Sequence, residues 1–176
     1  MYRERILFLL VLVCIAFSLA AALNATLPGD LAVTQWVQGL TSPALDDGAI
    51  AVGWMADIPP MAVGLAVAAL VLVVRGHRSY AIGLIIVGFV VIAIPLLQDL
   101  IGRPRPPEDF VPVLFTDHSP GYPSSHALTA TAYLGAMLWV SAKLVGPGQG
   151  AVWLLRLILA SAILVIGVSR VYAGAL

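Results

Sequence analysis

The chain has 176 residues, of which 61% are hydrophobic and only 10% are charged, against about 45–50% and about 25% in an ordinary soluble domain. This composition excludes a water-soluble globular domain, because long stretches have no polar side chains to cover a surface. Nine basic residues balance nine acidic ones, so we expect no nucleic-acid partner, and the single cysteine, Cys14, excludes a disulfide within one chain.

The first apolar run extends from Ile6 to Leu23 behind Arg3 and Arg5, and as a helix it can cross about 30 Å of hydrocarbon. Small residues near its end leave a cleaved signal peptide open, whereas its length and the further spans favour an uncleaved first span. The next stretch, 24–57, mixes prolines, glycines and acidic residues with two tryptophans. It predicts a loop with one or two short interfacial helices.

Four further apolar runs come next, and each predicts a membrane-spanning helix. They extend from Pro59 to Val74, from Tyr80 to about Leu97, from Ser124 to about Ala142 and from Ala151 to about Ser169. A tight basic turn at 75–78 separates the first two, and three prolines within 104–107 end the helix before a long loop, since proline lacks an N–H. The sequence therefore predicts an all-α, polytopic transmembrane bundle of about five spans, in a single membrane domain over residues 1–176.

Basic residues in the short loops predict the orientation, because Lys and Arg near the ends of spans favour the cytoplasmic side. The residues on the side of the N-terminus are Arg3, Arg5, Arg75, Arg78, Lys143 and Arg156. We therefore expect a cytoplasmic N-terminus and outward-facing loops after the first, third and fifth spans. Arg103, Arg105 and Arg170 lie at the outward ends, against this rule. Snorkelling to lipid phosphates explains any one of them, whereas the three together favour a functional site.

Three short motifs stand at these outward ends. The stretch Gly102–Pro106 reads Gly-Arg-Pro-Arg-Pro, with Gln98 seven positions before its second arginine. Pro123–His126 reads Pro-Ser-Ser-His where a span begins. Ser169–Arg170 ends the last span, and Leu176 comes after five residues. A lone Arg-Pro pair is a weak signal and a serine at a helix start is often only an N-cap, so the argument depends on the combination.

In this order and spacing the motifs resemble the three signature motifs of the type 2 phosphatidic acid phosphatase (PAP2) superfamily, which includes bacterial acid phosphatases and vanadium haloperoxidases. The resemblance covers about Tyr80 to Leu176 and implies a haloperoxidase-like helical core, normally of six spans. Three positions depart from the family pattern: Gln98 replaces a lysine, Ser125 a glycine and Leu176 a histidine. We therefore expect a domain that is incomplete at its C-terminus, a truncated version of an active ancestor.

The resemblance implies hydrolysis of a lipid phosphate or lipid pyrophosphate through a phosphohistidine, without a metal or another cofactor. Arg105 and Arg170 would clamp the phosphoryl oxygens, and the Gln98 amide would add a weaker donor than the family's lysine. Ser124 and the backbone N–H groups around Ser125 would add donors at a helix N-terminus, where an anion is already favoured.

Two histidines carry the family's reaction, and this chain has one of them. His126 matches the general acid and base, a role that suits imidazole at ordinary pH. Leu176 stands at the position of the missing nucleophilic histidine, and leucine has no lone pair to attack phosphorus, so turnover should be very low. His118 lies in the outward loop without positional support as a substitute, and we assign no chemistry to His77 in the cytoplasmic turn.

Alternatives stay open at this point. One is a phosphatase-family enzyme impaired at Leu176, and another is a non-catalytic membrane protein that binds phosphate or lipid phosphate head groups. A transporter or a structural subunit would explain the helices but not the three motifs on one face. The expected partners are membrane lipid and a lipid phosphate or isoprenoid pyrophosphate, and a homo-oligomer is open. We expect a location in the cell (inner) membrane, and the sequence does not choose between phosphatidic acid, phosphatidylglycerol phosphate and undecaprenyl pyrophosphate.

Overall fold

The computed structural model describes residues 2–24, 26–105, 113–114, 119–145 and 150–174. Within these residues the chain forms eight α-helices and no β-strand, which confirms the all-α prediction. The helices are α1 (Tyr2–Leu23), α2 (Asp30–Gln38), α3 (Pro43–Met55), α4 (Ile58–Val74), α5 (Arg78–Ile92), α6 (Ile94–Ile101), α7 (Ser125–Leu144) and α8 (Gly150–Tyr172).

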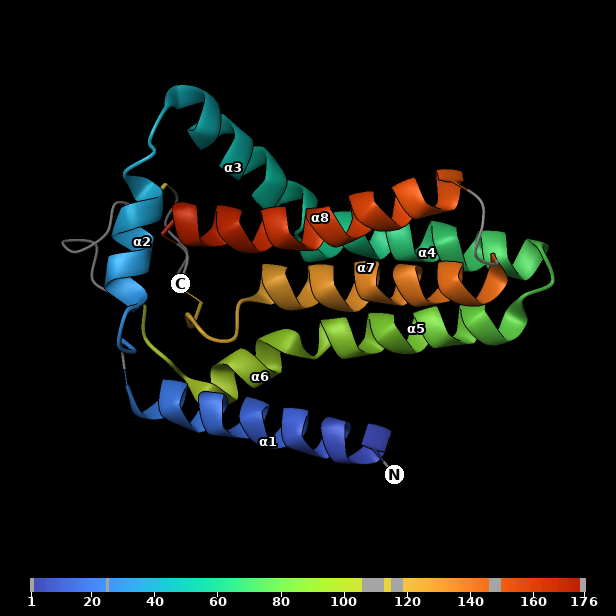
Figure 1. Ribbon diagram of the computed structural model, residues 1–176, viewed down its shortest axis with the longest axis horizontal. Coiled ribbons are helices and arrows are strands. Elements are labelled where there is room, and N and C mark those ends of the chain that lie inside the picture. Colours follow the sequence, from blue (N-terminus) through green and yellow to red (C-terminus); the bar gives the residue numbers. More distant parts are fainter. Residues whose placement is uncertain (1, 25, 106–112, 115–118, 146–149, 175–176) are drawn as a thin grey trace.

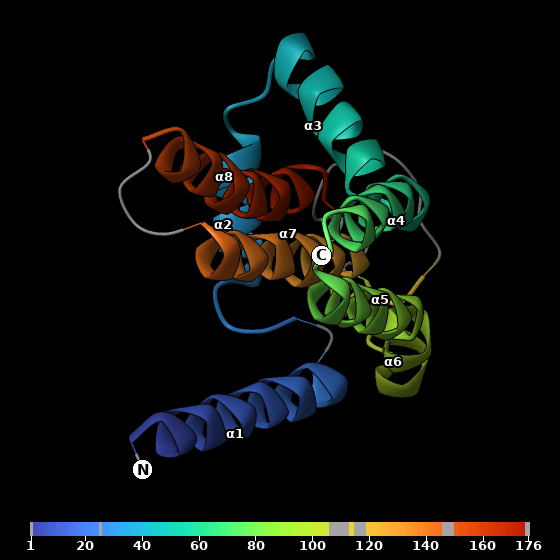
Figure 2. The same cartoon turned by 90° about the vertical axis from the view of Figure 1, so that its right-hand side faces the viewer.

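Four long helices, α4, α5, α7 and α8, run side by side as a bundle (Figure 1). Helix α7 contacts α4, α5 and α8 and so lies at the centre. Helix α6 continues from α5 toward the end of the bundle where α7 begins and α8 finishes, and α2 crosses that end (Figure 1). Helix α1 stands apart from the bundle and contacts it at α6 (Figure 2).

Four helical segments of the described chain are long and apolar enough to cross a membrane: α1, α5 together with α6, α7 and α8. Helices α3 and α4 meet at a bend of 53° and pass the same test as a pair, which raises the number to five. Large hydrophobic side chains such as Phe8, Phe89 and Leu164 are more than half exposed on these helices. An outer surface of this kind suits contact with lipid, as the composition predicts.

Short local signals set the helix boundaries around residues 24–57. One or two short interfacial helices are predicted here; the structure has two, α2 and α3, and their location at a membrane interface stays a prediction. The Ser42 hydroxyl accepts a hydrogen bond from the Leu45 N–H at 3.3 Å and caps α3, whose first residue is Pro43. Asp57 caps α4 in the same way by accepting from the Ile58 N–H at 3.1 Å. Helix α3 packs against both α8 and α4, so this segment helps to build the end of the bundle.

Two glycines lie at sharp turns where the chain changes direction. Gly76, at φ +81°, lies in the basic turn between α4 and α5, and Gly102, at φ +64°, ends α6 before the prolines. Other residues rarely adopt positive φ, whereas glycine does so at little cost. The predicted end of this helix before Pro104 is therefore confirmed, and the chain turns back toward α7.

The buried core is made of two small clusters on either side of α7, and small residues in both let the helices approach closely. One cluster joins α4, α5 and α7 through Ala69, Leu72, Ala81, Leu84 and Val140. The other joins the α3–α4 bend to α7 and α8 through Ala56, Ala130, Leu134 and Ile166.

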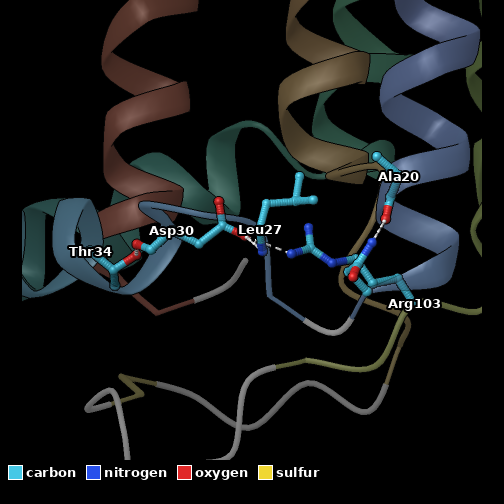
Figure 3. Close-up of polar contacts among 6 residues, drawn as sticks. Ala20, Leu27, Asp30, Thr34 and Arg103 are labelled. Atoms are coloured by element: carbon cyan, nitrogen blue, oxygen red, sulfur yellow. Dashed lines mark hydrogen bonds and ion pairs between the residues drawn. The ribbon is translucent and has the colours of Figure 1, made fainter.

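A charged pair connects the first third of the chain to the bundle. Arg103 comes just after α6, and its Nη2 donates to the Asp30 carboxylate at 2.6 Å (Figure 3). The same carboxylate oxygen accepts from the Leu27 N–H at 2.8 Å. The Arg103 side chain is only 9% exposed and that of Asp30 is 30% exposed. Snorkelling therefore does not account for Arg103, because its guanidinium points to a carboxylate within the protein.

We expect Asp30→Asn to lower the free energy of unfolding by about 1–3 kcal/mol, the usual range for losing a hydrogen bond to a charged group. The reason is that the buried Arg103 guanidinium keeps its charge but loses the opposing one. SDS-induced unfolding of the purified protein measures the difference. Asp47→Asn, at an exposed position in α3, is the matched control. Equal stability of the two variants would show that the pair contributes nothing.

Candidate functional site

Segments far apart in the sequence meet at the end of the bundle where α6 stops, α7 begins and α8 finishes (Figure 1). Hydrogen bonds connect them. The Gly121 N–H donates to the Arg103 carbonyl at 2.8 Å, and the Leu114 N–H donates to the Ala173 carbonyl at 3.2 Å. The three motifs predicted to share one face therefore lie at one end of the molecule.

Gln98, one helical turn before the end of α6, binds the loop that leads to α7. Its side chain is buried, and its amide nitrogen donates to the Pro123 carbonyl at 2.9 Å and to the Pro120 carbonyl at 3.3 Å. These carbonyls lie in a loop without a regular hydrogen-bond pattern, so a side chain supplies their donor. In this structure the amide positions the loop, and its contact with a phosphate stays a prediction.

Arg105 anchors the other side of the same loop. Its Nε donates to the Ser119 carbonyl at 2.9 Å and its Nη2 donates to the Ser119 hydroxyl at 3.2 Å. The side chain is partly buried. Both contacts are with neutral groups of Ser119, and they hold the Arg105 side chain against the loop that leads to α7.

The start of α7 is rich in hydrogen-bond donors. The Ser124 hydroxyl accepts from the Ala127 N–H at 3.4 Å, so this serine is the N-cap of the helix. A hydroxyl that accepts a bond can still donate its proton to another group. The Ser125 hydroxyl lies 3.3 Å from Nδ1 of His126. With the N–H groups of the first turn, these side chains form a helix N-terminus suited to an anion.

Asp57 is a residue of this end that the sequence analysis missed. Its Oδ1 lies 4.0 Å from Nε2 of His126, whose side chain is 15% exposed. This contact joins the start of α4 to the start of α7. In the sequence, an acidic residue just before Ile58 and two prolines indicates only a helix cap.

Arg170, in the last turn of α8, is 3% exposed and fits against a glycine. A Cβ built on Gly53 would lie 2.4 Å from Nη1 of Arg170, so the guanidinium occupies the space that any larger residue in α3 would fill. Nearby, the Gln38 amide donates to the Tyr172 carbonyl at 3.0 Å, and the Tyr172 hydroxyl donates to Asp46. Contacts with α2 and α3 thus fix the end of α8.

The contacts of His126 and Arg170 place both side chains beside the α3–α4 bend. His126 approaches Asp57 and Arg170 approaches Gly53, four residues apart along the chain. The predicted residues Arg105, Ser124 and Ser125 lie on segments bonded to the same end. The predicted site position Leu176 lies outside the described residues, as does the loop histidine His118.

This end can bind an anion. Two guanidinium groups remain charged at any physiological pH, and the dipole of α7 adds partial positive charge at its N-terminus. Their location among apolar helices lowers the local dielectric and so strengthens attraction to a negative group. Among the described residues, no three His, Cys, Asp or Glu side chains are grouped to hold a metal ion.

Comparison with known proteins identifies the family. A family model described as PAP2 superfamily matches residues 76–175, more than half of the chain. The match includes the three motifs and ends one residue before Leu176. No curated protein and no solved structure matches the chain.

We expect Gly53→Ala to weaken binding of inorganic phosphate by about tenfold, the effect of losing about 1.4 kcal/mol of interaction. The added methyl group would displace the flexible end of the Arg170 side chain, not the backbone, so the protein should still fold. Phosphate-dependent thermal stabilisation measures the change. The control is Gly48→Ala, also in α3, where an added Cβ meets nothing within 4 Å. Equal phosphate affinity in both variants would show that Gly53 does not position Arg170.

Proposed function

The chain belongs to the PAP2 superfamily, and from this membership we propose that its motif-bearing end binds the phosphoryl group of a lipid phosphate or lipid pyrophosphate. The observation that carries the proposal is the meeting of three separate segments: the Arg105 segment, the start of α7 and the end of α8. A phosphomonoester brings two negative charges, and these segments supply matching charge and donors. The chain is an integral membrane protein, so a lipid is the natural carrier of that group.

Each residue has a distinct role in this proposal. Arg105 and Arg170 contact the equatorial phosphoryl oxygens, and Ser124 donates its hydroxyl proton to one of them. The first-turn N–H groups of α7 stabilise the charge that grows as phosphorus becomes five-coordinate. His126, with Asp57 beside it, holds the proton that a leaving oxygen would take. These roles use groups of the chain alone.

Hydrolysis is impaired in this proposal because Leu176 stands where the family pattern has its nucleophilic histidine. Without a lone pair at that position, no phosphohistidine forms there, and removal of a nucleophile commonly eliminates most of the catalysed rate. Binding needs only the arginines and the helix start, which are present. Recognition of lipid phosphate without efficient turnover is therefore the function that these residues support best.

The proposal includes the orientation expected from the basic loops, with the N-terminus in the cytoplasm and the phosphoryl site on the outer side of the cell (inner) membrane. In the structure the basic turn at 75–78 and Lys143 lie at the bundle end opposite the site, a distribution that supports this orientation. A homo-oligomer is a further expectation of this proposal, since large apolar faces of the helices are exposed.

We expect short-chain phosphatidic acid to raise the melting temperature of the purified protein, and Arg105→Ala to weaken this binding about tenfold or more, since a hydrogen bond to a charged group contributes about 1.5–3 kcal/mol. The control is Arg78→Ala, an exposed arginine at the opposite end of the bundle. The proposed site would be refuted if phosphatidic acid does not shift the melting temperature. It would also be refuted if Arg105→Ala binds the lipid as tightly as Arg78→Ala and the wild type do.

We expect the purified chain to release no inorganic phosphate from phosphatidic acid above the level of the His126→Ala variant. The reason is that both proteins lack the nucleophile, so loss of the acid removes nothing further. A phosphate-release assay makes this comparison. Robust turnover that disappears in His126→Ala would show that another group attacks phosphorus.

A further inference from the structure

An apolar groove runs along the bundle between α4 and α5, with α7 at its base, and encloses about 230 Å³. On α4 its lining extends from Ile58 to Ala69, and on the antiparallel α5 from Ile85 to Ile92. The rise from residue 58 to residue 69 is about 16 Å at 1.5 Å per residue. That length is close to one leaflet, half of a hydrocarbon core about 30 Å thick.

The groove begins beside the proposed phosphoryl site. Ile58 comes directly after Asp57, whose carboxylate lies 4.0 Å from His126. On α7, Thr129 lines the groove and comes three residues, less than one turn, after His126. A lipid whose phosphate lies at His126 would therefore have its glycerol and the start of its chains at the upper end of the groove.

The groove is accessible from the lipid side of the bundle. Five of its lining residues are exposed at the surface, among them Ala66, Phe89 and Ile92. Its inner wall includes Ala69 and Val91, which are buried. A hydrocarbon chain can thus enter sideways from the bilayer without first leaving the membrane.

Thr129 is the polar feature of this apolar lining that needs a partner. It is 0% exposed, and its Oγ1 makes no hydrogen bond to any residue in the described part of the chain. A buried hydroxyl without a partner destabilises the protein, because it has lost its hydrogen bonds to water. An acceptor on a bound ligand would satisfy it.

We propose that the groove holds an acyl chain of a glycerolipid phosphate and that the Thr129 hydroxyl donates a hydrogen bond to the ester carbonyl at the top of that chain. The inference rests on the proposed function, which places the phosphate at His126. A glycerolipid has this acceptor a short distance below its phosphate, where Thr129 lies below His126. A polyprenyl phosphate carries a bare hydrocarbon at that level and leaves Thr129 unsatisfied. Thr129 therefore selects ester-linked lipids over isoprenoid ones.

The test compares lipids by thermal stabilisation of the purified full chain: dioleoyl phosphatidic acid, its di-ether analogue without carbonyls, and a polyprenyl phosphate. We expect the diester to bind about five- to tenfold more tightly than the other two, the effect of about one hydrogen bond. Thr129→Val should remove this preference. Thr131→Val, the same change at an exposed position of α7, should keep it.

A second pair of variants tests the groove itself. Ala66→Phe fills the groove and should weaken diester binding, while Val67→Phe, its exposed neighbour outside the lining, should not. Any of three results would overturn the inference. They are equal binding of the diester and di-ether lipids, an unchanged lipid preference in Thr129→Val, and equal effects of Ala66→Phe and Val67→Phe on diester binding. In those cases all lipids would still stabilise the protein in an Arg105-dependent way, whereas failure of the proposed function would abolish stabilisation by every lipid phosphate.

Discussion

The Gln98 amide group joins the end of α6 to the start of α7, and the geometry of the site depends on it. The loop that it holds is rich in proline, so it has few N–H groups with which to form turns of its own. A buried amide supplies the missing donors without adding a charge to an apolar region. The family pattern places a lysine here, and the glutamine keeps the donors while it removes the charge. The start of α7 is thereby fixed relative to α6.

Three arginines meet at this end of the bundle, and their partners give them different roles. Arg103 faces the Asp30 carboxylate at 2.6 Å, so its charge is balanced within the protein and it serves to attach α2. Arg105 contacts the neutral groups of Ser119, and Arg170 lies against the backbone of Gly53. Arg105 and Arg170 bring two further guanidinium groups to this end, and the dipole of α7 adds partial positive charge at its N-terminus. A dianionic ligand is the natural complement of that arrangement.

The sequence was sufficient to predict the helices, because apolar runs, prolines and caps act locally. It predicted the end of the third span before Pro104 and the start of the next span at Ser124, and both are confirmed. The family was inferred from three motifs in order and is shown by the match to residues 76–175. Gly53 and the Asp30 partner of Arg103 could not be predicted, because each depends on helix packing between distant parts of the chain. No sequence pattern specifies which backbone a guanidinium will approach.

Helix α7 links the two kinds of recognition that a lipid phosphate requires. Its first turn can bind a phosphoryl group but cannot distinguish lipids, since every candidate carries the same oxygens. Discrimination must come from surfaces further along the molecule, where the candidates differ in linkage and chain. Thr129 lies at the depth where the candidate lipids begin to differ. It is on the same helix as His126, so the spacing between the two residues is constant. In the proposed mode of binding the phosphate lies at His126, and Thr129 then distinguishes an ester linkage from a bare hydrocarbon chain.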